Sequence, residues 1–359
     1  MTVYTGKLVK NKRESAARYS IGGLCLAIIF CTGVSVGVGP MPLSIVESFQ
    51  AILTRFFSFN NELPQYAIVV VESIRLPRTL LGLVVGATLA VSGAAIQGLF
   101  RNPLADPGLI GVSSGAALAA VASIVLAGSI LKPVFDLFGS YTLSIMAFLG
   151  GLGTTCVVAW IATSRFGTSI TTMLLAGIAI NIACGSGIGI LTYLADDTML
   201  RTLTFWQMGS LGGATWTDLS ITSLMCMVTL ICILRYSKQL NALLLGESEA
   251  RHLGVNVDAV KFRIILLVAL GVGAAVAVSG MIGFVGLVVP HIVRMSLGPD
   301  HRYLLPASAL LGGLFLVLAD MLSRTLIAPA ELPIGLITAI IGGPFFIALI
   351  ALRSNRGAL

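Results

Sequence analysis

Two arginines at the start of a long apolar run are the clearest residues in this chain that could do chemistry. Arg75 and Arg78 flank Pro77 in the stretch VESIRLPRTL, residues 71–80. A guanidinium offers a planar fork of donors that can grip a carboxylate through two parallel hydrogen bonds. Pro77 suits the first turn of a helix and would hold both arginines in fixed positions. Such a pair is suited to holding a carboxylate-bearing partner, and anchoring to lipid headgroups is the alternative interpretation.

The sequence has neither a nucleotide-binding loop nor a zinc-protease motif. The single Gly-Lys pair, at residues 6–7, is followed by leucine, so no G-x-x-x-x-G-K-[ST] loop can form. H-E-x-x-H does not occur, and His252, His291 and His301 are far apart in the sequence. The six cysteines lie in apolar runs without a C-x-x-C pair, as is typical of small core residues. We therefore expect no enzyme activity from this chain by itself, no metal site and no permanently bound cofactor.

The composition is that of a polytopic membrane protein. Hydrophobic residues make up 57% of the 359 residues and charged residues only 10%, against about 25% charged in a soluble domain. The 40 glycines would let helices approach closely in lipid. G-x-x-x-G spacings occur at Gly82/Gly86, Gly111/Gly115 and Gly185/Gly189. The net charge of +7 is dispersed among apolar runs, which fits orientation in a membrane and gives no reason to expect a nucleic-acid partner.

The apolar runs predict an all-α fold with about ten transmembrane helices in one domain, residues 1–359. A spanning helix needs roughly 20 apolar residues. The runs lie near 19–39, 76–98, 108–130, 141–163, 170–194, 217–235, 262–279, 282–297, 304–323 and 334–352. Residues 42–59 have apolar side chains at helical spacing and predict an interfacial helix. The first run is predicted to be an uncleaved span, with a cleavable signal peptide as the alternative.

The distribution of positive charge predicts the orientation. With the N-terminal tail, residues 1–18, in the cytoplasm, 16 of the 22 lysines and arginines fall on the cytoplasmic side, as the positive-inside rule requires. Both termini are then cytoplasmic. The outer side keeps Arg55, Arg75, Arg78, Lys132, Arg201 and Arg324.

Acidic residues within the predicted spans are scarce. Asp320 is the clearest, and it precedes Arg324 by four residues, which predicts an i,i+4 ion pair. Carriers driven by ions generally need buried acids or unwound helices. The scarcity argues against an ion-coupled secondary transporter, and an integral-membrane enzyme would need a polar catalytic cluster that the sequence lacks.

One long polar stretch, residues 237–261, lies between the sixth and seventh runs on the predicted cytoplasmic side. It contains SKQLNALLLGESEARHLGVNVDAVK. A short helix, a turn around Gly246 and a second helix ended by Gly254 would fit its pattern. An amphipathic helix pair suits a groove on another protein, whereas the alternative is a solvated connecting loop.

Four long segments resemble, in order, the permease family of ATP-binding-cassette importers for iron siderophores, haem and vitamin B12 (FecCD/BtuC-like). They are RLPRTLLGLVVGATLAVSGAAIQGLFRNPLADPGLIGVSSGA (75–116), LLLGESEARHLGV (243–255), SGMIGFVGLVVPHIVR (279–294) and AELPIGLITAIIGGPFFIALI (330–350). The resemblance covers roughly residues 70–355. It implies a type II importer permease in a bacterial inner membrane, working as a homodimer with two cytosolic ATPase subunits that bind ATP. It also implies a periplasmic substrate-binding protein.

The resemblance also implies roles for individual residues. Arginines at the outer rim of this family pair with glutamates of the binding protein, and the matching positions are Arg75, Arg78 and Arg324. The coupling segment that contacts the ATPase matches Gly246, Glu247, Glu249, Arg251 and Gly254. The cytoplasmic gate region matches Thr168, Ser169, Thr171 and Thr172, although hydroxyl residues are also ordinary at a helix start.

Within the family, residues 173–216 are most similar to the haem-importing branch. The stretch that decides this is ADD followed by LRTLTFW, residues 195–206. Haem is therefore the expected substrate, with ferric siderophores and then vitamin B12 as alternatives. Candidate contacts along the path are Tyr193, Met199, Arg201 and Met208, of which the three other than Arg201 have packing as the alternative role.

Overall fold

Apolar runs of this length form helices because, in a hydrocarbon environment, a helix satisfies its own backbone N–H and C=O groups. The computed structural model describes residues 2–41, 43–56, 64–165 and 167–354. Within these residues, the long apolar helices are α1 (Thr2–Gly37), α4 (Leu76–Leu99), α7 (Thr142–Ala162), α8 (Ile170–Leu194), α10 (Trp216–Arg235), α13 (Val257–Ser279) and α15 (His301–Thr325). Shorter apolar helices are α5 (Val112–Val125), α14 (Val285–Leu297) and α16 (Ile334–Ser354). These seven long and three shorter helices correspond to the ten predicted runs.

Short elements connect the long helices. The helical ones are α2 (Ile45–Phe56), α3 (Gln65–Val69), η1 (Val70–Arg75), η2 (Pro107–Ile110), α6 (Lys132–Phe138), η3 (Gly139–Tyr141), α9 (Asp197–Met208), α11 (Ser237–Leu244) and α12 (Glu247–His252). Strands β1 (Thr163–Ser164) and β2 (Gly167–Thr168) form an antiparallel hairpin in which Thr163 faces Thr168. Of the predicted interfacial segment 42–59, residues 45–56 form α2, while 42 and 57–59 lie outside the described residues.

Several predicted boundaries differ from the structure, among them the starts of the second and third spans. The second span was predicted to begin at residue 76, but α3, the π-helical turn η1 and α4 run on from Gln65 to Leu99. The third span was predicted to begin at residue 108, but α5 begins at Val112 after η2, whose first turn is capped by Asp106 through a 2.7 Å bond from the Gly108 N–H. The N-terminal tail is helical and continuous with the first span.

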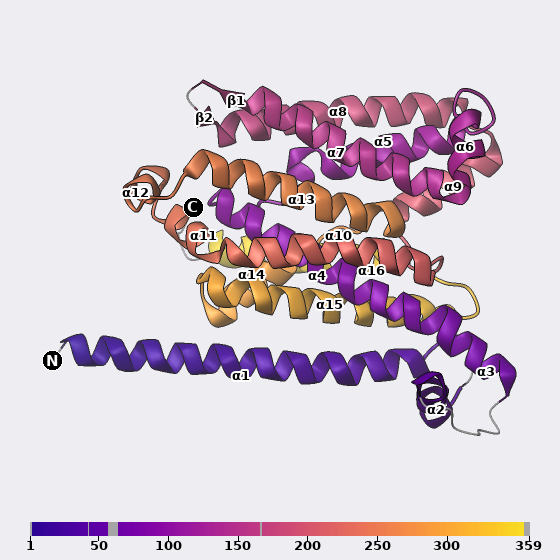
Figure 1. Cartoon of the computed structure of the whole chain (residues 1–359), viewed down its shortest axis with the longest axis horizontal. Coiled ribbons are helices and arrows are strands. Elements are labelled where there is room, and N and C mark those ends of the chain that lie inside the picture. The colour runs from indigo at the N-terminus through magenta and orange to yellow at the C-terminus, as the bar shows by residue number, and fades with distance from the viewer. Residues whose placement is uncertain (1, 42, 57–63, 166, 355–359) are drawn as a thin grey trace.

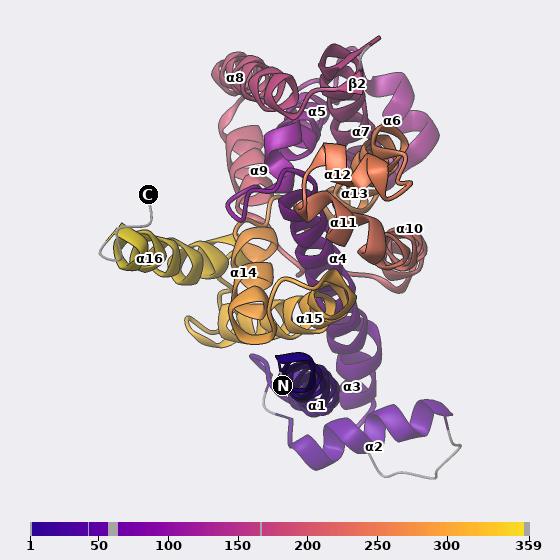
Figure 2. The same ribbon diagram turned by 90° about the vertical axis from the view of Figure 1, so that its left-hand side faces the viewer.

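The bundle has two ends, which place the functional segments apart. One end carries α11, α12 and the β1–β2 hairpin, and we call it the α12 end; the other carries α2, α3, α6 and α9, and we call it the α3 end (Figure 1). The start of α1 and the end of α16 both lie at the α12 end (Figures 1 and 2). The first span therefore starts at the end of the bundle where the last span finishes, and the cytoplasmic orientation of that end stays a prediction.

Helix α4 forms the centre of the bundle and packs against α15, α10, α14 and α13 (Figure 2). Glycine permits the closest of these contacts: a Cβ on Gly93 would lie 1.8 Å from the Gly286 carbonyl oxygen, and one on Gly86 would lie 2.3 Å from the Gly312 oxygen. Gly185 and Gly189 of α8, in contrast, have no atom within 4 Å of such a Cβ. The small-residue spacing in α4 thus serves packing inside the chain, and that in α8 faces open space.

Candidate functional site: a buried arginine cluster and a polar junction at opposite ends

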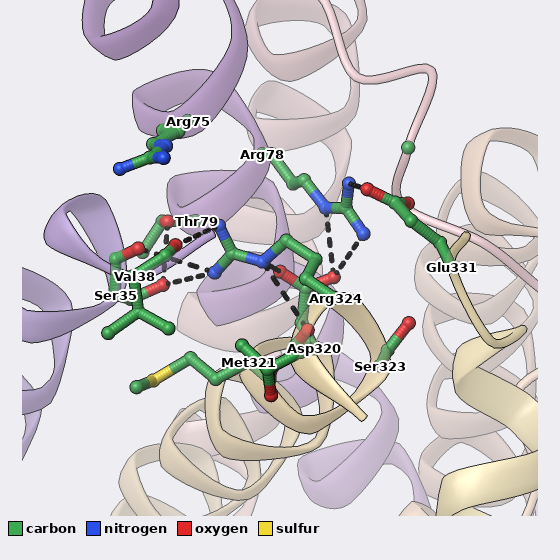
Figure 3. Close-up of polar contacts among 12 residues, drawn as sticks. Ser35, Val38, Arg75, Arg78, Thr79, Asp320, Met321, Ser323, Arg324 and Glu331 are labelled. Atoms are coloured by element: carbon green, nitrogen blue, oxygen red, sulfur yellow. Dashed lines mark hydrogen bonds and ion pairs between the residues drawn. The ribbon is translucent and has the colours of Figure 1, made fainter. Parts of the chain in front are cut away.

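Arg78 lies at the centre of an ion cluster at the α3 end. Its Nε and Nη2 atoms both contact Oδ1 of Asp320 at 2.9 Å, and its Nη1 donates to both carboxylate oxygens of Glu331 at 2.9 Å (Figure 3). Arg78 is supplied by α4, Asp320 by α15, and Glu331 by the segment between α15 and α16. The cluster therefore joins three parts of the chain that are far apart in the sequence.

Arg324 completes the cluster from the other side of Asp320. Its Nε pairs with Oδ2 of Asp320 at 3.1 Å, which confirms the predicted i,i+4 pair. Its Nη2 donates to the Ser35 hydroxyl at 2.8 Å and its Nη1 to the Val38 carbonyl at 3.2 Å (Figure 3). The Ser35 hydroxyl also bonds to that of Thr79 at 2.9 Å. The end of α1 is thereby fastened to α4 and α15.

Arg75 is held separately by backbone carbonyls. Its Nη1 donates to the carbonyls of Val36 and Gly37 at 2.9 and 2.8 Å, and its Nη2 donates to that of Met41 at 2.6 Å. These acceptors belong to the end of α1 and the residues after it. Through these three carbonyl acceptors, the Arg75 guanidinium links η1 to the end of α1.

The three arginines expected to meet the binding protein are buried within the chain, and their docking role stays a prediction. Arg75 and Arg78 are each 4% exposed, and Arg324 is 2% exposed. The sequence correctly placed them at one end of the bundle, and the structure brings Arg78 and Arg324 together around Asp320. Their guanidiniums are turned inward because Asp320, Glu331 and the end of α1 supply the acceptors. Of these acidic partners Glu331 is the one with access to solvent, with its side chain 36% exposed.

Glu331 was missed by sequence reasoning, although it lies in the AELPIG stretch that carries part of the family resemblance. Two bonds hold its segment to α15: the Leu332 N–H donates to the Ser323 carbonyl at 3.0 Å, and the Ser323 hydroxyl donates to the Leu332 carbonyl. The motif indicated that this segment is part of the family signature, but it did not indicate that the Glu331 carboxylate contacts Arg78.

The predicted helix–turn–helix within residues 237–261 is confirmed at the α12 end. Gly246, at φ 118°, separates α11 from α12. Gly254, at φ 83°, follows the end of α12, and the N–H of Val255 donates back to the Ala250 carbonyl at 3.0 Å. This is the closure in which a left-handed glycine satisfies the last carbonyls of a helix. Both glycines stand where an L side chain would be strained.

The remaining residues of the predicted coupling segment divide into paired and unpaired positions. Glu247 forms an ion pair with Lys261 at 2.7 Å, and Arg251 forms one with Asp258 at 3.0 Å. Glu249 is exposed, as are the large apolar side chains of Leu245 and Leu253. This surface therefore combines exposed leucines with charge.

A second contact fixes α11 to the start of α15. The Asn241 amide donates to Oδ1 of Asp300 at 2.7 Å, and the His301 N–H donates to the Asn241 side-chain oxygen at 2.9 Å. Hydrogen bonds from Arg302, the closest at 2.6 Å, lower the pKa of Asp300 to about 2 from its ordinary value of 3.8, with further help from Asn241. The Asp300 carboxylate therefore stays ionised well into the acid range.

The predicted gate residues lie next to α12, at the start of α8. Thr168 ends β2 and is buried, whereas Ser169, Thr171 and Thr172 are exposed. Ser169 caps α8, because its hydroxyl accepts the Thr172 N–H at 3.3 Å. The structure thus supports the capping role for Ser169, and the gate role stays a prediction.

The candidate path residues gather at the α3 end of α8 and on α9. Tyr193, in the last turn of α8, is 89% exposed, and Arg201 of α9 is exposed with its guanidinium 5.9 Å from the Phe205 ring centroid. Met199 and Met208 are half-buried on α9. The end of α9 meets the start of α16, where the Ile334 N–H donates to the Gly209 carbonyl at 3.0 Å.

Comparison with known proteins places this architecture in a family. The sequence profile of the FecCD transport family matches residues 25–352. The chain is 53% identical over 279 residues to the hemin transport system permease protein HmuU of Yersinia pestis, covering 77% of this chain and 82% of the relative. It is 44% identical over 293 residues to the cobalamin import system permease protein BtuC of Halobacterium salinarum, covering 82% and 76%.

A solved structure agrees with this assignment. The fold matches an inward-facing conformation of a metal-chelate type ABC transporter with a TM-score of 0.79 and 33% identity, covering 92% of this chain and 98% of that one. Proteins of this family are transport permeases, and the ATPase activity of the importer belongs to separate subunits. The chain belongs to the FecCD transport family and is the permease of an ABC importer.

Proposed function

We propose that this permease moves haem into the cytoplasm, along a path between two copies of the chain. The observation that carries the proposal is its identity to the hemin permease of Yersinia pestis, which is higher than its identity to the cobalamin permease. The likeness to a metal-chelate transporter supports ferric siderophores as the second candidate class, and the cobalamin permease supports vitamin B12 as the third.

The exposed faces of α8, α9 and α16 supply a surface for the path. Along α8, Leu175, Ile182 and Tyr193 are 64%, 66% and 89% exposed, and no atom lies near Gly185 or Gly189. Haem is a flat apolar macrocycle with two propionates, and a wall of small and apolar side chains would let it slide. Residues 170–208 contain no histidine, so this wall offers no strong axial ligand to trap the iron. Arg201, exposed at the α3 end, would meet a propionate.

The α12 end faces the cytoplasm in this proposal. Most lysines and arginines fall at this end, as expected for the cytoplasmic side. Each copy would place α11 and α12 in a groove of an ATPase subunit, with Leu245 and Leu253 as apolar anchors and Glu249 beside them. Energy for transport would then come from ATP bound by that partner.

The α3 end would receive the periplasmic binding protein. The buried positions of Arg75, Arg78 and Arg324 limit how these arginines could contact the binding protein. Arg75 and Arg324 are buried and donate to internal acceptors, whereas the Nη1 atom of Arg78 donates to the partly exposed Glu331. A carboxylate of the binding protein would therefore reach Arg78 by taking the place of Glu331. Arg75 and Arg324 would hold the rim in shape.

Growth on defined iron sources tests the proposed substrate. Deletion of this chain from its native host should abolish growth on hemin as the only iron source, and return of the chain on a plasmid should restore it. Growth on ferric siderophores should be unchanged. Unchanged growth on hemin, combined with loss of growth on a ferric siderophore, would overturn the haem assignment and leave the importer architecture in place.

A further inference from the structure

A buried lysine at the α12 end is the observation that the proposed roles do not yet explain. Lys261 lies on the second turn of α13, and its side chain is only 3% exposed. Its ammonium contacts two acceptors, Oε1 of Glu247 on α12 and the carbonyl of Thr168 on β2, each at 2.7 Å. One side chain of α13 thus contacts both the coupling segment and the gate hairpin.

Asp258, one turn earlier on α13, makes the matching pair of contacts. Its Oδ1 accepts the Thr168 N–H at 3.2 Å, and its Oδ2 pairs with Arg251 of α12 at 3.0 Å. The hairpin approaches so closely that a Cβ on Gly167, at φ 107°, would lie 2.5 Å from Oδ1. Both polar backbone groups of Thr168 are therefore bonded by side chains of α13, and each of those side chains also bonds a charged residue of α12.

Burial of Lys261 needs a specific reason. A lysine near a membrane surface usually buries its stem and keeps its ammonium in water. Removing the ammonium from water is strongly unfavourable unless partners replace the lost hydration. Here the partners are one carboxylate and one carbonyl drawn from two different elements. Lys261 therefore links α12 to β2, since a movement of either acceptor affects the bond to the other.

The hairpin is short enough to pass displacement on to α8. Thr168 is the last residue of β2 and Ile170 the first of α8, so Ser169 alone separates them. The Ser169 N–H also bonds to the Ala162 carbonyl at the end of α7 at 3.0 Å. A shift of Thr168 must therefore shift the start of α8, where Thr171 and Thr172 are exposed.

We propose that Lys261 and Asp258 are positioning residues that transmit movement of α12 to the start of α8, so that ATPase-driven movement opens or closes the cytoplasmic gate. This inference rests on the coupling role proposed above and on the predicted gate role of Thr168, Ser169, Thr171 and Thr172. It adds the connection between them. Lys261 supplies a charge-assisted bond to each side, and Asp258 supplies a second, parallel connection.

The test uses the full complex of permease, ATPase and binding protein in liposomes. A Thr172→Cys reporter is placed in a chain whose six native cysteines are replaced by alanine, and its labelling rate is compared with and without ATP. Lys261→Met keeps a long apolar stem but removes the charge. Arg302→Met is the matched control, since the ion pair of Arg302 at the same end of the bundle, at 2.6 Å, is with Asp300 and not with a residue of α12 or β2.

In Lys261→Met we expect ATP hydrolysis close to that of the parent, while the ATP-dependent change in Thr172→Cys labelling is lost. Transport should fall by about tenfold or more, as expected when a charge-assisted hydrogen bond is removed from the coupling step. Arg302→Met should match the parent in all three readouts. Asp258→Asn, which keeps an acceptor for Thr168 but weakens the pair with Arg251, should give a smaller loss in the same direction.

The possible failures are distinguishable. A labelling response and transport equal to those of the parent in Lys261→Met would refute the connection and leave the gate role intact. Loss of ATP hydrolysis together with transport would also refute it, because the lysine would then act on ATPase docking. If Lys261→Met does not assemble, Asp258→Asn decides by the same readouts. A parent chain whose Thr172→Cys labelling ignores ATP would overturn the gate assignment itself.

Discussion

Replacement of Asp320 by asparagine should strongly destabilise the folded protein. Asp320 is 2% exposed and bonds two guanidiniums: Nε and Nη2 of Arg78 at 2.9 Å, and Nε of Arg324 at 3.1 Å. The amide of asparagine keeps the shape, but it turns an N–H₂ group toward one guanidinium and leaves two buried positive charges with one acid fewer. Breaking a buried ion pair by removing one partner costs about 3–5 kcal/mol.

The lower part of that range is expected here. Arg78 keeps Glu331, and Arg324 keeps its contacts to Ser35 and Val38. We therefore expect the free energy of unfolding to fall by about 3 kcal/mol, measured by reversible denaturation of the purified protein in mixed detergent micelles. Glu331→Gln is the matched control: it removes the partly exposed acid of the same cluster and should cost less than about 1 kcal/mol.

A triple replacement separates the energy of charge burial from that of packing. Arg78→Met, Asp320→Leu and Arg324→Met together remove every buried charge of the cluster, and such swaps are often neutral or stabilising. The triple variant should be less destabilised than Asp320→Asn alone. A loss below about 1 kcal/mol in Asp320→Asn, or a larger loss in the triple variant, would refute the view that paired burial of charge holds this rim together.

Three further predictions follow from contacts elsewhere in the chain. Glu331→Ala frees the Nη1 of Arg78 and should tighten docking of the binding protein by about two- to fivefold, since exposed pairs are worth up to about 1 kcal/mol. Weaker docking in surface plasmon resonance would contradict the proposal that a carboxylate of the binding protein takes the place of Glu331. The pKa of Asp300 is lowered to about 2, so its contribution to stability is complete above about pH 4 and is lost as the pH falls through 2. The difference in stability between the parent and Asp300→Asn should therefore close over this range. A constant difference would contradict the stabilising role of the ionised carboxylate. Gly93→Val would place a Cβ 1.8 Å from the Gly286 oxygen and should cost at least about 3 kcal/mol through overpacking, whereas Gly185→Val, with no atom nearby, should leave thermal stability unchanged.

The sequence was sufficient for features that depend on local pattern. Apolar runs predicted the spanning helices because length and hydropathy alone decide whether a helix can cross a bilayer. The pair of Asp320 with Arg324 was predictable because residues four apart share one face of a helix. The turn at Gly246 and the end of α12 at Gly254 were predictable because few residues other than glycine adopt positive φ.

Features that depend on distant parts of the chain were not predictable. The bond from Arg78 to Glu331 joins residues 253 positions apart, and no local pattern shows that pairing. The burial of Arg75 depends on carbonyls near the end of α1, and every residue has a carbonyl, so the sequence gives no sign of it. Reversal of Arg75 to glutamate would therefore damage the fold itself, whereas exposure on the rim would have predicted an effect on docking alone.

Lys261 shows the same limit at the α12 end. By sequence it is one of many cationic residues that orient the chain, and its spacing from Asp258 fits a solvated helix start. Only the folded arrangement brings Thr168, 93 positions away, against its ammonium. Its burial depends on tertiary contacts between α12, α13 and the hairpin.

Uptake by reconstituted liposomes tests whether this permease imports haem. The permease and its ATPase are placed in the membrane with ATP inside, and the binding protein is supplied outside with haem, a ferric siderophore or vitamin B12. We expect accumulation of haem that requires ATP and the binding protein, with far less of the other two compounds. Accumulation of a siderophore or vitamin B12 in place of haem would contradict the proposed substrate, and uptake without ATP would contradict the importer mechanism.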